Sequence, residues 1–420
     1  MRPSPQAVHA GKTPVVFVVR LQQKRGEVMG LKARVTEPSR RLFAMHRSPR
    51  TPWGGVAPPA PQSLTNRKLA MKAQLIALAA VAACGAAAAQ SSVTVYGIAD
   101  VFVGSVKNET NLDTTPTKAS NGVVNSGGLS SSRLGFKGTE DLGGGLKAKF
   151  QIETSVKFDA PEASKLGDRE AWVGLAGNFG EVQLGSPNNA YDDVHDMSKS
   201  GFKSIFSAMD NVFVTNKAGT EAENGLKYIT PNFGGFEAAL SYSFGENKTA
   251  TTKADSTLAL GVKYKTGPFA VALGHFQHKD AVAAAGASIF KVGPAGNNQK
   301  STATNLNATY DFGVAKLKGT IANGKVTTDA QPDVKINEYE IGLDVPVTTA
   351  LSVSVGYGQS KQKIAGVLDA KTSGYGVTAL YTLSKRTAVY AGLATASEKD
   401  GAGVKTDKAT KYGVGIRHNF

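Results

Sequence analysis

From residue 90 onward, the chain is built of short segments in which apolar and polar residues alternate. In residues 146–158, Leu146 and Phe150 belong to an apolar series that alternates with Lys147 and other polar residues. Successive side chains of a strand point to opposite faces of a sheet, so this period of two predicts strands with one apolar and one polar face. The same alternation is found in residues 258–265 and 412–420.

About sixteen such segments can be counted. They start near residues 93, 130, 146, 168, 181, 226, 236, 256, 269, 302, 315, 334, 351, 372, 387 and 410. An even number of antiparallel strands closes a sheet with both chain ends on one side, and sixteen strands leave an aqueous lumen. No apolar run of 18 residues and no helical stripe interrupts them.

The period of two is equally typical of soluble sandwiches, so the connections between the segments decide the fold class. Short joints fall at residues 141–145, 177–180, 232–235, 267–268, 348–349 and 384–386, and long polar ones at 105–128, 186–225, 281–301 and 400–409. Short turns at one rim and long loops at the other are typical of outer-membrane barrels. We therefore predict an all-β fold, a 16-stranded antiparallel up-and-down transmembrane β-barrel over residues 90–420.

The basic character of the chain comes from its first 89 residues. They contain 14 of the 48 basic and 2 of the 33 acidic residues, which leaves 34 basic and 31 acidic residues for 90–420. The net charge of +15 therefore does not describe the predicted barrel, and its near balance of charge excludes a nucleic-acid-binding surface.

Residues 71–89 have the pattern of a secretory signal peptide. Lys72 gives a basic start, a short apolar run follows, and small residues end at Ala89, so we expect cleavage before Gln90. The alternative is lipidation of Cys84, the only cysteine, because residues 81–84 are similar to a lipoprotein cleavage box.

Residues 1–70 are rich in Pro, Arg and Ser and show no sustained period. We expect no domain there. The segment is either a non-native extension of a reading frame that starts at Met71 or a disordered arm.

Several stretches resemble the trimeric general porins of Gram-negative outer membranes, over essentially all of residues 90–420. They are SSVTVYGIAD at 91–100, LSSSRLGFKGTEDLGGGLKAKFQIE at 129–153, AWVGLAGNFGEVQLG at 171–185 and the closing YGVGIRHNF at 412–420. The resemblance implies a homotrimeric outer-membrane channel for passive diffusion of ions and small hydrophilic solutes. It also implies contact with outer-membrane lipid and lipopolysaccharide, and an assembly signal at Phe420 that the barrel-assembly machinery reads.

The resemblance further implies that the third loop, near 186–225, folds into the barrel and forms a pore constriction. Carried over residue by residue, the basic wall of this constriction is Arg133, Lys137 and Arg169, and the acidic loop side is Asp192, Asp193 and Asp196. Alternation independently assigns Arg133 and Lys137 to the polar face. Arg169 shares parity with Val173, so its inward position requires a bulge or an inward stripe of small residues.

Two departures from the family pattern bear on ion selectivity. Ser186 stands where an arginine is usual, and the loop tip contains Lys199 and Lys203 in place of an acidic tip. We therefore expect weak selectivity that leans toward anions.

No catalytic, metal or cofactor chemistry is indicated. The His275 and His278 rings would lie on opposite faces of a strand, and Gly143–Gly145 lacks the following helix and lysine of a phosphate loop. Trp172 and the scattered tyrosines are expected at the membrane interface. Two other functions stay open, namely a substrate-selective channel and a structural or adhesive surface barrel.

Overall fold

The computed structural model describes residues 92–420, apart from 114, 161–164, 218–221, 284–295 and 330. The expected signal peptide, its cleavage site at Ala89, Cys84 and the extension 1–70 lie outside the described residues.

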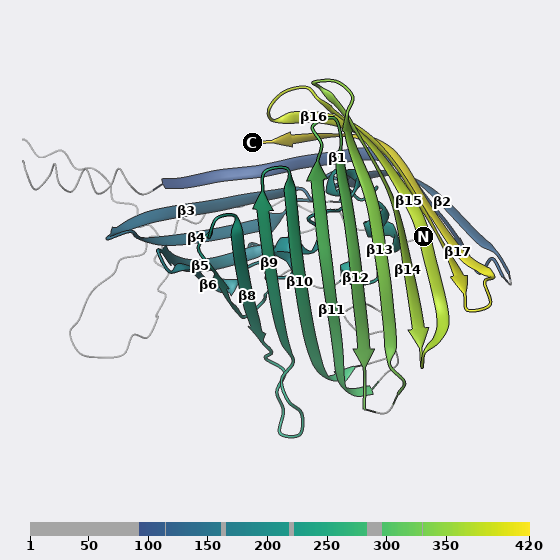
Figure 1. Cartoon of the computed structure of the whole chain (residues 1–420), viewed down its shortest axis with the longest axis horizontal. Coiled ribbons are helices and arrows are strands. Elements are labelled where there is room, and N and C mark those ends of the chain that lie inside the picture. Colours follow the sequence, from purple (N-terminus) through teal and green to yellow (C-terminus); the bar gives the residue numbers. More distant parts are fainter. Residues whose placement is uncertain (1–91, 114, 161–164, 218–221, 284–295, 330) are drawn as a thin grey trace, which may run out of the picture. The chain divides into compact units, whose positions relative to one another are not determined.

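One antiparallel sheet of seventeen strands makes up the described part of the chain and closes on itself (Figure 1). Its strands are β1 (Ser92–Thr110), β2 (Thr117–Ser126), β3 (Arg133–Gly143), β4 (Leu146–Ser155), β5 (Glu170–Gly177), β6 (Gly180–Ser186), β7 (Gly225–Ile229), β8 (Phe236–Phe244), β9 (Ser256–Thr266), β10 (Phe269–Ala283), β11 (Gly296–Asp311), β12 (Lys316–Thr327), β13 (Val334–Pro346), β14 (Leu351–Ile364), β15 (Val367–Thr382), β16 (Thr387–Asp400) and β17 (Lys405–Asn419).

The ring has sixteen positions, because β2 and β3 share one of them. β2 pairs with residues 101–110 of β1, and β3 pairs with residues 92–98 of the same strand. The other edge of β1 pairs with β17 over residues 98–109, which closes the sheet. The predicted 16-stranded antiparallel barrel is thereby confirmed.

Some of the predicted long connections are shorter in the structure, because strands continue into the residues that were assigned to loops. Residues 105–110 extend β1, and all of β2 lies within the expected loop 105–128. The β2 sequence, TKASNGVVNS, is largely exposed and polar on both faces. A strand with water on both sides has no apolar series, so the period of two cannot reveal it.

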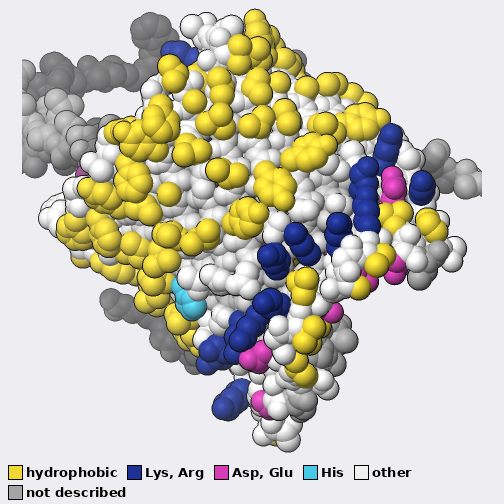
Figure 2. Space-filling model, turned by 45° about the vertical axis from the view of Figure 1, so that its right-hand side comes forward, with side chains coloured by type: hydrophobic (Ala, Val, Ile, Leu, Met, Phe, Trp, Pro, Cys, Tyr) yellow, Lys and Arg dark blue, Asp and Glu magenta, His cyan; other side chains and the backbone are white. Residues whose placement is uncertain are grey.

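The two faces of the barrel differ as the alternation predicts. Along β12, Ile321 is 55% exposed on the outer face, whereas its inward neighbour Thr320 is 3% exposed. Figure 2 shows the outer face as a broad apolar surface. In a membrane this surface faces hydrocarbon, and the polar face lines the interior.

The segment between β6 and β7, residues 187–224, contains short helical turns. These are α2 (Asp192–His195), η1 (Gly201–Lys203), α3 (Ala208–Val212) and η2 (Thr215–Lys217). None of the helices in the described residues has the length and hydropathy needed to cross a membrane.

Side chains of the inner face hold this segment. The Glu340 carboxylate on β13 accepts hydrogen bonds from the Ser200 hydroxyl at 2.7 Å and the Met209 N–H at 3.0 Å. The Glu338 carboxylate on the same strand accepts from the N–H of Thr215 at 3.2 Å and from its hydroxyl. Buried carboxylates that accept several donors anchor the backbone that donates to them.

A row of inward-facing glycines makes room for the segment. A Cβ added to Gly356 on β14 would overlap Ser200, and one added to Gly376 on β15 or Gly392 on β16 would overlap Phe206. Glycines on β9, β10, β12 and β13 meet the same segment, namely Gly261, Gly274, Gly324 and Gly342. The backbone of the wall and the segment can therefore approach closely where no side chain intervenes.

Candidate functional site

Two of the three predicted basic residues, Arg133 and Arg169, meet at one carboxylate on the inner wall. Arg133 Nη1 lies 3.3 Å and Arg169 Nε lies 2.6 Å from Glu153 Oε1 on β4. The Tyr96 hydroxyl donates to Glu153 Oε2 at 3.0 Å. Lys137 Nζ lies 5.0 Å from the centre of the Tyr96 ring, a cation–π distance. Two guanidinium groups thus share a single carboxylate.

Arg169 reaches this cluster because it lies just before β5, outside the regular strand. Its N–H donates to the Glu153 carbonyl at 3.2 Å, and the preceding residues form a turn. Val173 within the strand points outward and is 59% exposed. The parity of a strand does not apply to a turn residue, which resolves the conflict between Arg169 and Val173.

Sequence reasoning did not single out Glu153. Alternation assigns it to the polar face together with several other residues of 146–158. Its role depends on the register of β3 against β4, which sets Gly135 opposite Glu153 and leaves space beside it. No local pattern reports that pairing.

The three predicted loop carboxylates each have a nearby basic partner. Asp192 Oδ1 lies 3.3 Å from His195 Nδ1, Asp193 Oδ2 lies 2.7 Å from Lys227 Nζ on β7, and Asp196 Oδ1 lies 2.7 Å from Lys203 Nζ. Asp193 and Asp196 therefore form ion pairs with lysines of β7 and of the loop, and the two arginines of the basic wall pair with Glu153.

Burial favours the neutral form of both Asp193 and Asp196, but the net shifts of their pKa values have opposite directions. Burial raises the pKa of Asp193, and the neighbouring Lys227 only partly opposes it. Burial also favours the neutral form of Asp196, but His195 and Lys203 outweigh it and hold the pKa of Asp196 below its usual range. Asp193 therefore takes up a proton before Asp196 when the pH falls.

The expectation that Trp172 lies at the membrane interface is wrong. Its side chain faces inward, is 9% exposed, and its indole N–H donates to Glu170 Oε2 at 3.0 Å. Register explains this, because Trp172 is opposite the inward Gln151 of β4. Several tyrosines do lie on the outer face, including Tyr310, Tyr381 and Tyr412.

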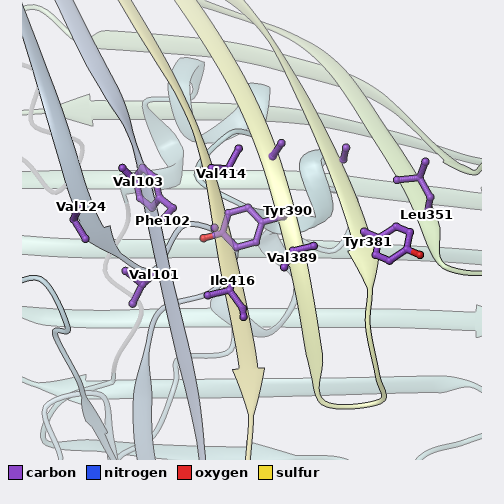
Figure 3. A pocket seen from close by; sticks show the side chains of 13 residues that line it. Val101, Phe102, Val103, Val124, Leu351, Tyr381, Val389, Tyr390, Val414 and Ile416 are labelled. Carbon is purple, nitrogen blue, oxygen red and sulfur yellow. The ribbon is translucent and has the colours of Figure 1, made fainter.

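A groove and a cavity lie on opposite faces of the barrel wall. Figure 3 shows a groove of about 600 Å³ whose lining residues include Val103, Val414 and Ile416, which are about half exposed on the outer face. A cavity of about 1030 Å³ lies on the inner face, between Met197 of the segment 187–224 and the short turns. Its charged lining is Lys263, Lys265, Lys316, Lys318, Glu237, Asp311 and Asp344. The inner cavity is the one suited to water and ions.

The two histidines of β10 have separate partners. His275 Nδ1 lies 2.8 Å from the Thr304 hydroxyl on β11, and His278 Nδ1 lies 2.8 Å from the Thr257 hydroxyl on β9. Among the described residues, no group of three His, Cys, Asp or Glu side chains could hold a metal ion.

Comparison with known proteins identifies the family. The model of the Gram-negative porin family matches residues 76–401. Outer membrane porin protein 32 of Delftia acidovorans is 37% identical over 372 residues, which cover 83% of this chain and all of that protein. The chain belongs to the Gram-negative porin family. It is an outer-membrane channel for passive diffusion of ions and small hydrophilic solutes, and not an enzyme.

Other relatives agree with this assignment. An outer membrane porin protein of Bordetella pertussis is 30% identical to this porin, again over 83% of the chain and all of the relative. The solved structure of the anion-selective porin from Comamonas acidovorans has a TM-score of 0.65 and 33% identity, and it covers 79% of this chain and 100% of its own. An OmpT structure of Vibrio cholerae, at 18% identity and a TM-score of 0.59, shares the fold.

Replacing Glu153 by glutamine should increase the preference of the porin for anions, because Arg133 and Arg169 would lose their shared negative partner. One elementary charge at about 8 Å in water contributes about 0.5 kcal/mol, with opposite sign for an anion and a cation, so we expect about a fivefold rise in the anion-to-cation permeability ratio. The zero-current potential of single channels in a salt gradient measures it. Glu109→Gln, on the outer face of β1, is the matched control, and an equal shift in both variants would contradict the assignment.

Proposed function

We propose that this porin is a homotrimeric diffusion channel with a weak preference for anions. Its constriction is formed by the segment 187–224 and by the basic wall of Arg133, Lys137 and Arg169. The observation that carries the proposal is the sharing of Glu153 by two guanidinium groups, which leaves the wall with an excess of positive charge.

The loop side supports the same sign of selectivity. Asp193 and Asp196 are each paired with a lysine, so they contribute little net negative charge to the lumen. A ring of fixed positive charge raises the local concentration of anions in a narrow pore. The solved relative from Comamonas acidovorans is described as anion-selective.

The basic wall and the loop carboxylates contribute to ion selectivity with opposite signs. Removing the one or the other should therefore shift the selectivity in opposite directions. Arg133→Gln together with Arg169→Gln should move the zero-current potential in a salt gradient toward cation preference. Asn in place of Asp192, Asp193 and Asp196 should move it toward anion preference. Planar-bilayer recordings at low salt provide the measurement.

Salt gives an internal control for these variants. Screening shortens the range of charges from about 10 Å at 0.1 M to about 3 Å at 1 M, so both shifts should shrink as salt rises. If neither set of substitutions moves the potential at low salt, the constriction lies elsewhere. Conductance that one solute blocks would instead favour a substrate-selective channel.

Acidification should increase the anion preference in two steps. The pKa of Asp193 is raised by burial, so this carboxyl becomes neutral first and leaves the charge of Lys227 uncompensated. The pKa of Asp196 is lowered, so its charge persists to lower pH. Zero-current potentials measured from neutral to acidic pH should show the first step in the native porin and lose it in Asp193→Asn. Asp196→Asn should retain it, and a first step that survives in Asp193→Asn would exclude this assignment.

We further propose that Phe420 promotes assembly by the barrel-assembly machinery. The Phe420 carbonyl accepts from the Gly97 N–H at 3.0 Å, the Phe420 N–H donates to the Gly97 carbonyl at 3.1 Å, and the ring occupies the space above Gly97. The residue therefore sits at the seam where the last strand meets the first.

Deleting Phe420 should lower the yield of heat-resistant trimer severalfold and leave the conductance of the channels that do form unchanged. Semi-native electrophoresis of outer membranes measures the yield. Phe312→Asp, in an exposed turn between β11 and β12, is the control and should assemble normally. Normal yield after deletion of Phe420 would refute its role.

Residues 71–89 are proposed to act as a cleaved signal peptide, with Gln90 as the first mature residue. The porin purified from outer membranes should give an N-terminal sequence that begins at Gln90, whether translation starts at Met1 or at Met71. A blocked N-terminus at a lipid-modified Cys84 would overturn this cleavage site.

A further inference from the structure

Arg417 lies on the last strand, β17, on the inner face of the barrel. It is directly opposite Asp100 on β1 and Ala388 on β16, whose side chains are 0% and 5% exposed. The preceding residue, Ile416, is 49% exposed on the outer face (Figure 3). Because successive side chains of a strand point to opposite faces, the partly exposed side chain of Arg417 is directed to the interior.

The stretch between β2 and β3, residues 127–132, holds this arginine. We refer to it as the β2–β3 linker. Arg417 Nη1 donates to Ser130 Oγ at 3.2 Å, and Arg133 Nε donates to the carbonyl of the next linker residue at 2.9 Å. A further linker carbonyl accepts from the N–H of Ile205, in the segment between β6 and β7, at 3.1 Å. The linker therefore connects Arg417 both to a member of the basic wall and to the segment that we assign to the constriction.

The guanidinium of Arg417 has no carboxylate partner. Among the described residues, the arginines with a carboxylate oxygen within 4.0 Å are Arg133 and Arg169, and both contact Glu153. Arg417 Nε is buried, and no described residue accepts a hydrogen bond from it. The chain therefore compensates the charge of Arg417 less directly than that of the other two arginines.

Asp100 is the carboxylate directly opposite, but other donors hold it. Its oxygens accept from the backbone N–H groups of residues 128–130 at 2.7–3.0 Å and from the hydroxyl of Tyr390. A carboxylate that accepts several backbone N–H groups fixes the backbone that donates to them. Asp100 therefore secures the β2–β3 linker. Because Asp100 is fully buried and Arg417 is partly exposed, a solute in the lumen can contact the guanidinium but not the carboxylate.

We propose that Arg417 is a third guanidinium of the basic wall and contacts small anionic solutes as they cross the barrel. This inference rests on the proposed anion preference and assigns part of it to a residue of the last strand. Arg133 and Arg169 direct donors to Glu153, whereas Arg417 directs one donor to the linker and none to a carboxylate. A guanidinium with such donors binds anions, and its fixed charge raises their local concentration in a narrow pore.

Single-channel recordings of Arg417→Gln test the proposal. At about 0.1 M salt, where charges act over about 10 Å, the anion-to-cation permeability ratio should fall about fivefold, because one positive charge is lost from the path. The zero-current potential in a salt gradient gives this ratio. Arg417→Lys keeps the charge and should keep most of the preference. An unchanged ratio in Arg417→Gln would overturn the proposal.

Arg386→Gln is the matched control, because Arg386 is an exposed arginine in the turn between β15 and β16. It removes the same charge outside the proposed path and should leave the ratio nearly unchanged. An equal shift in Arg386→Gln and Arg417→Gln would show a general effect of charge and contradict the assignment.

Comparison with the double variant of Arg133→Gln and Arg169→Gln separates this inference from the proposed function. If the double variant shifts the ratio and Arg417→Gln does not, Arg417 is no part of the basic wall, and the proposed constriction stands. If Arg417→Gln shifts the ratio and the double variant does not, the role of Arg417 is confirmed, and the constriction assigned to Arg133 and Arg169 is wrong.

Chemical modification gives a second readout, in which charge is added to the path. Cys84 is the only cysteine of the chain, so Arg417→Cys in a Cys84→Ala background presents a single thiol. A water-soluble methanethiosulfonate that adds an ammonium group should restore the anion preference, and one that adds a sulfonate should lower it further. Ile416→Cys, on the outer face, should keep its ratio with either reagent. A thiol at position 417 that does not react, or that reacts without a change in the ratio, would refute contact with the permeation path.

Discussion

Closure of the sheet is the constraint on which the rest of this porin depends. Hydrocarbon offers no partner to a backbone N–H or C=O, so an edge strand within it would leave a row of costly unpaired groups. In the described residues, β1 pairs with β17 along one edge and with β2 and β3 along the other, which closes the ring. Closure also forces the alternation, because each strand then has one face toward lipid and one toward the lumen.

The interior arrangement follows from this division. The inner face holds the segment 187–224 by small apolar clusters together with polar groups and glycines. Glu338 and Glu340 accept its N–H groups, and Phe206 packs against Phe102 and Tyr390. Directional hydrogen bonds to the wall thus act together with several small apolar clusters, where an ordinary soluble domain has one broad core.

Alternation and connection length were enough to predict the barrel, because both follow directly from closure in a membrane. The same reasoning assigned Arg133 to the polar face, where it meets Glu153. It could not find Glu153, misplaced Trp172 and missed β2, because these depend on register or on strands with water at both faces. Lateral pairing is a non-local property, and a one-residue change in register moves a side chain to the other face.

The glycine row has a consequence for the way solutes traverse the barrel. Glycines on β12 to β16 are covered by the segment 187–224, so that part of the wall is lost to the permeation path. The same segment also covers Gly261 on β9 and Gly274 on β10, so we expect the permeation path to lie beside the basic wall of β3 to β5. Natural substitutions in this porin would accordingly fall into two groups. Those on the open side of the barrel would change permeability, and those on the side covered by the segment 187–224 would change stability.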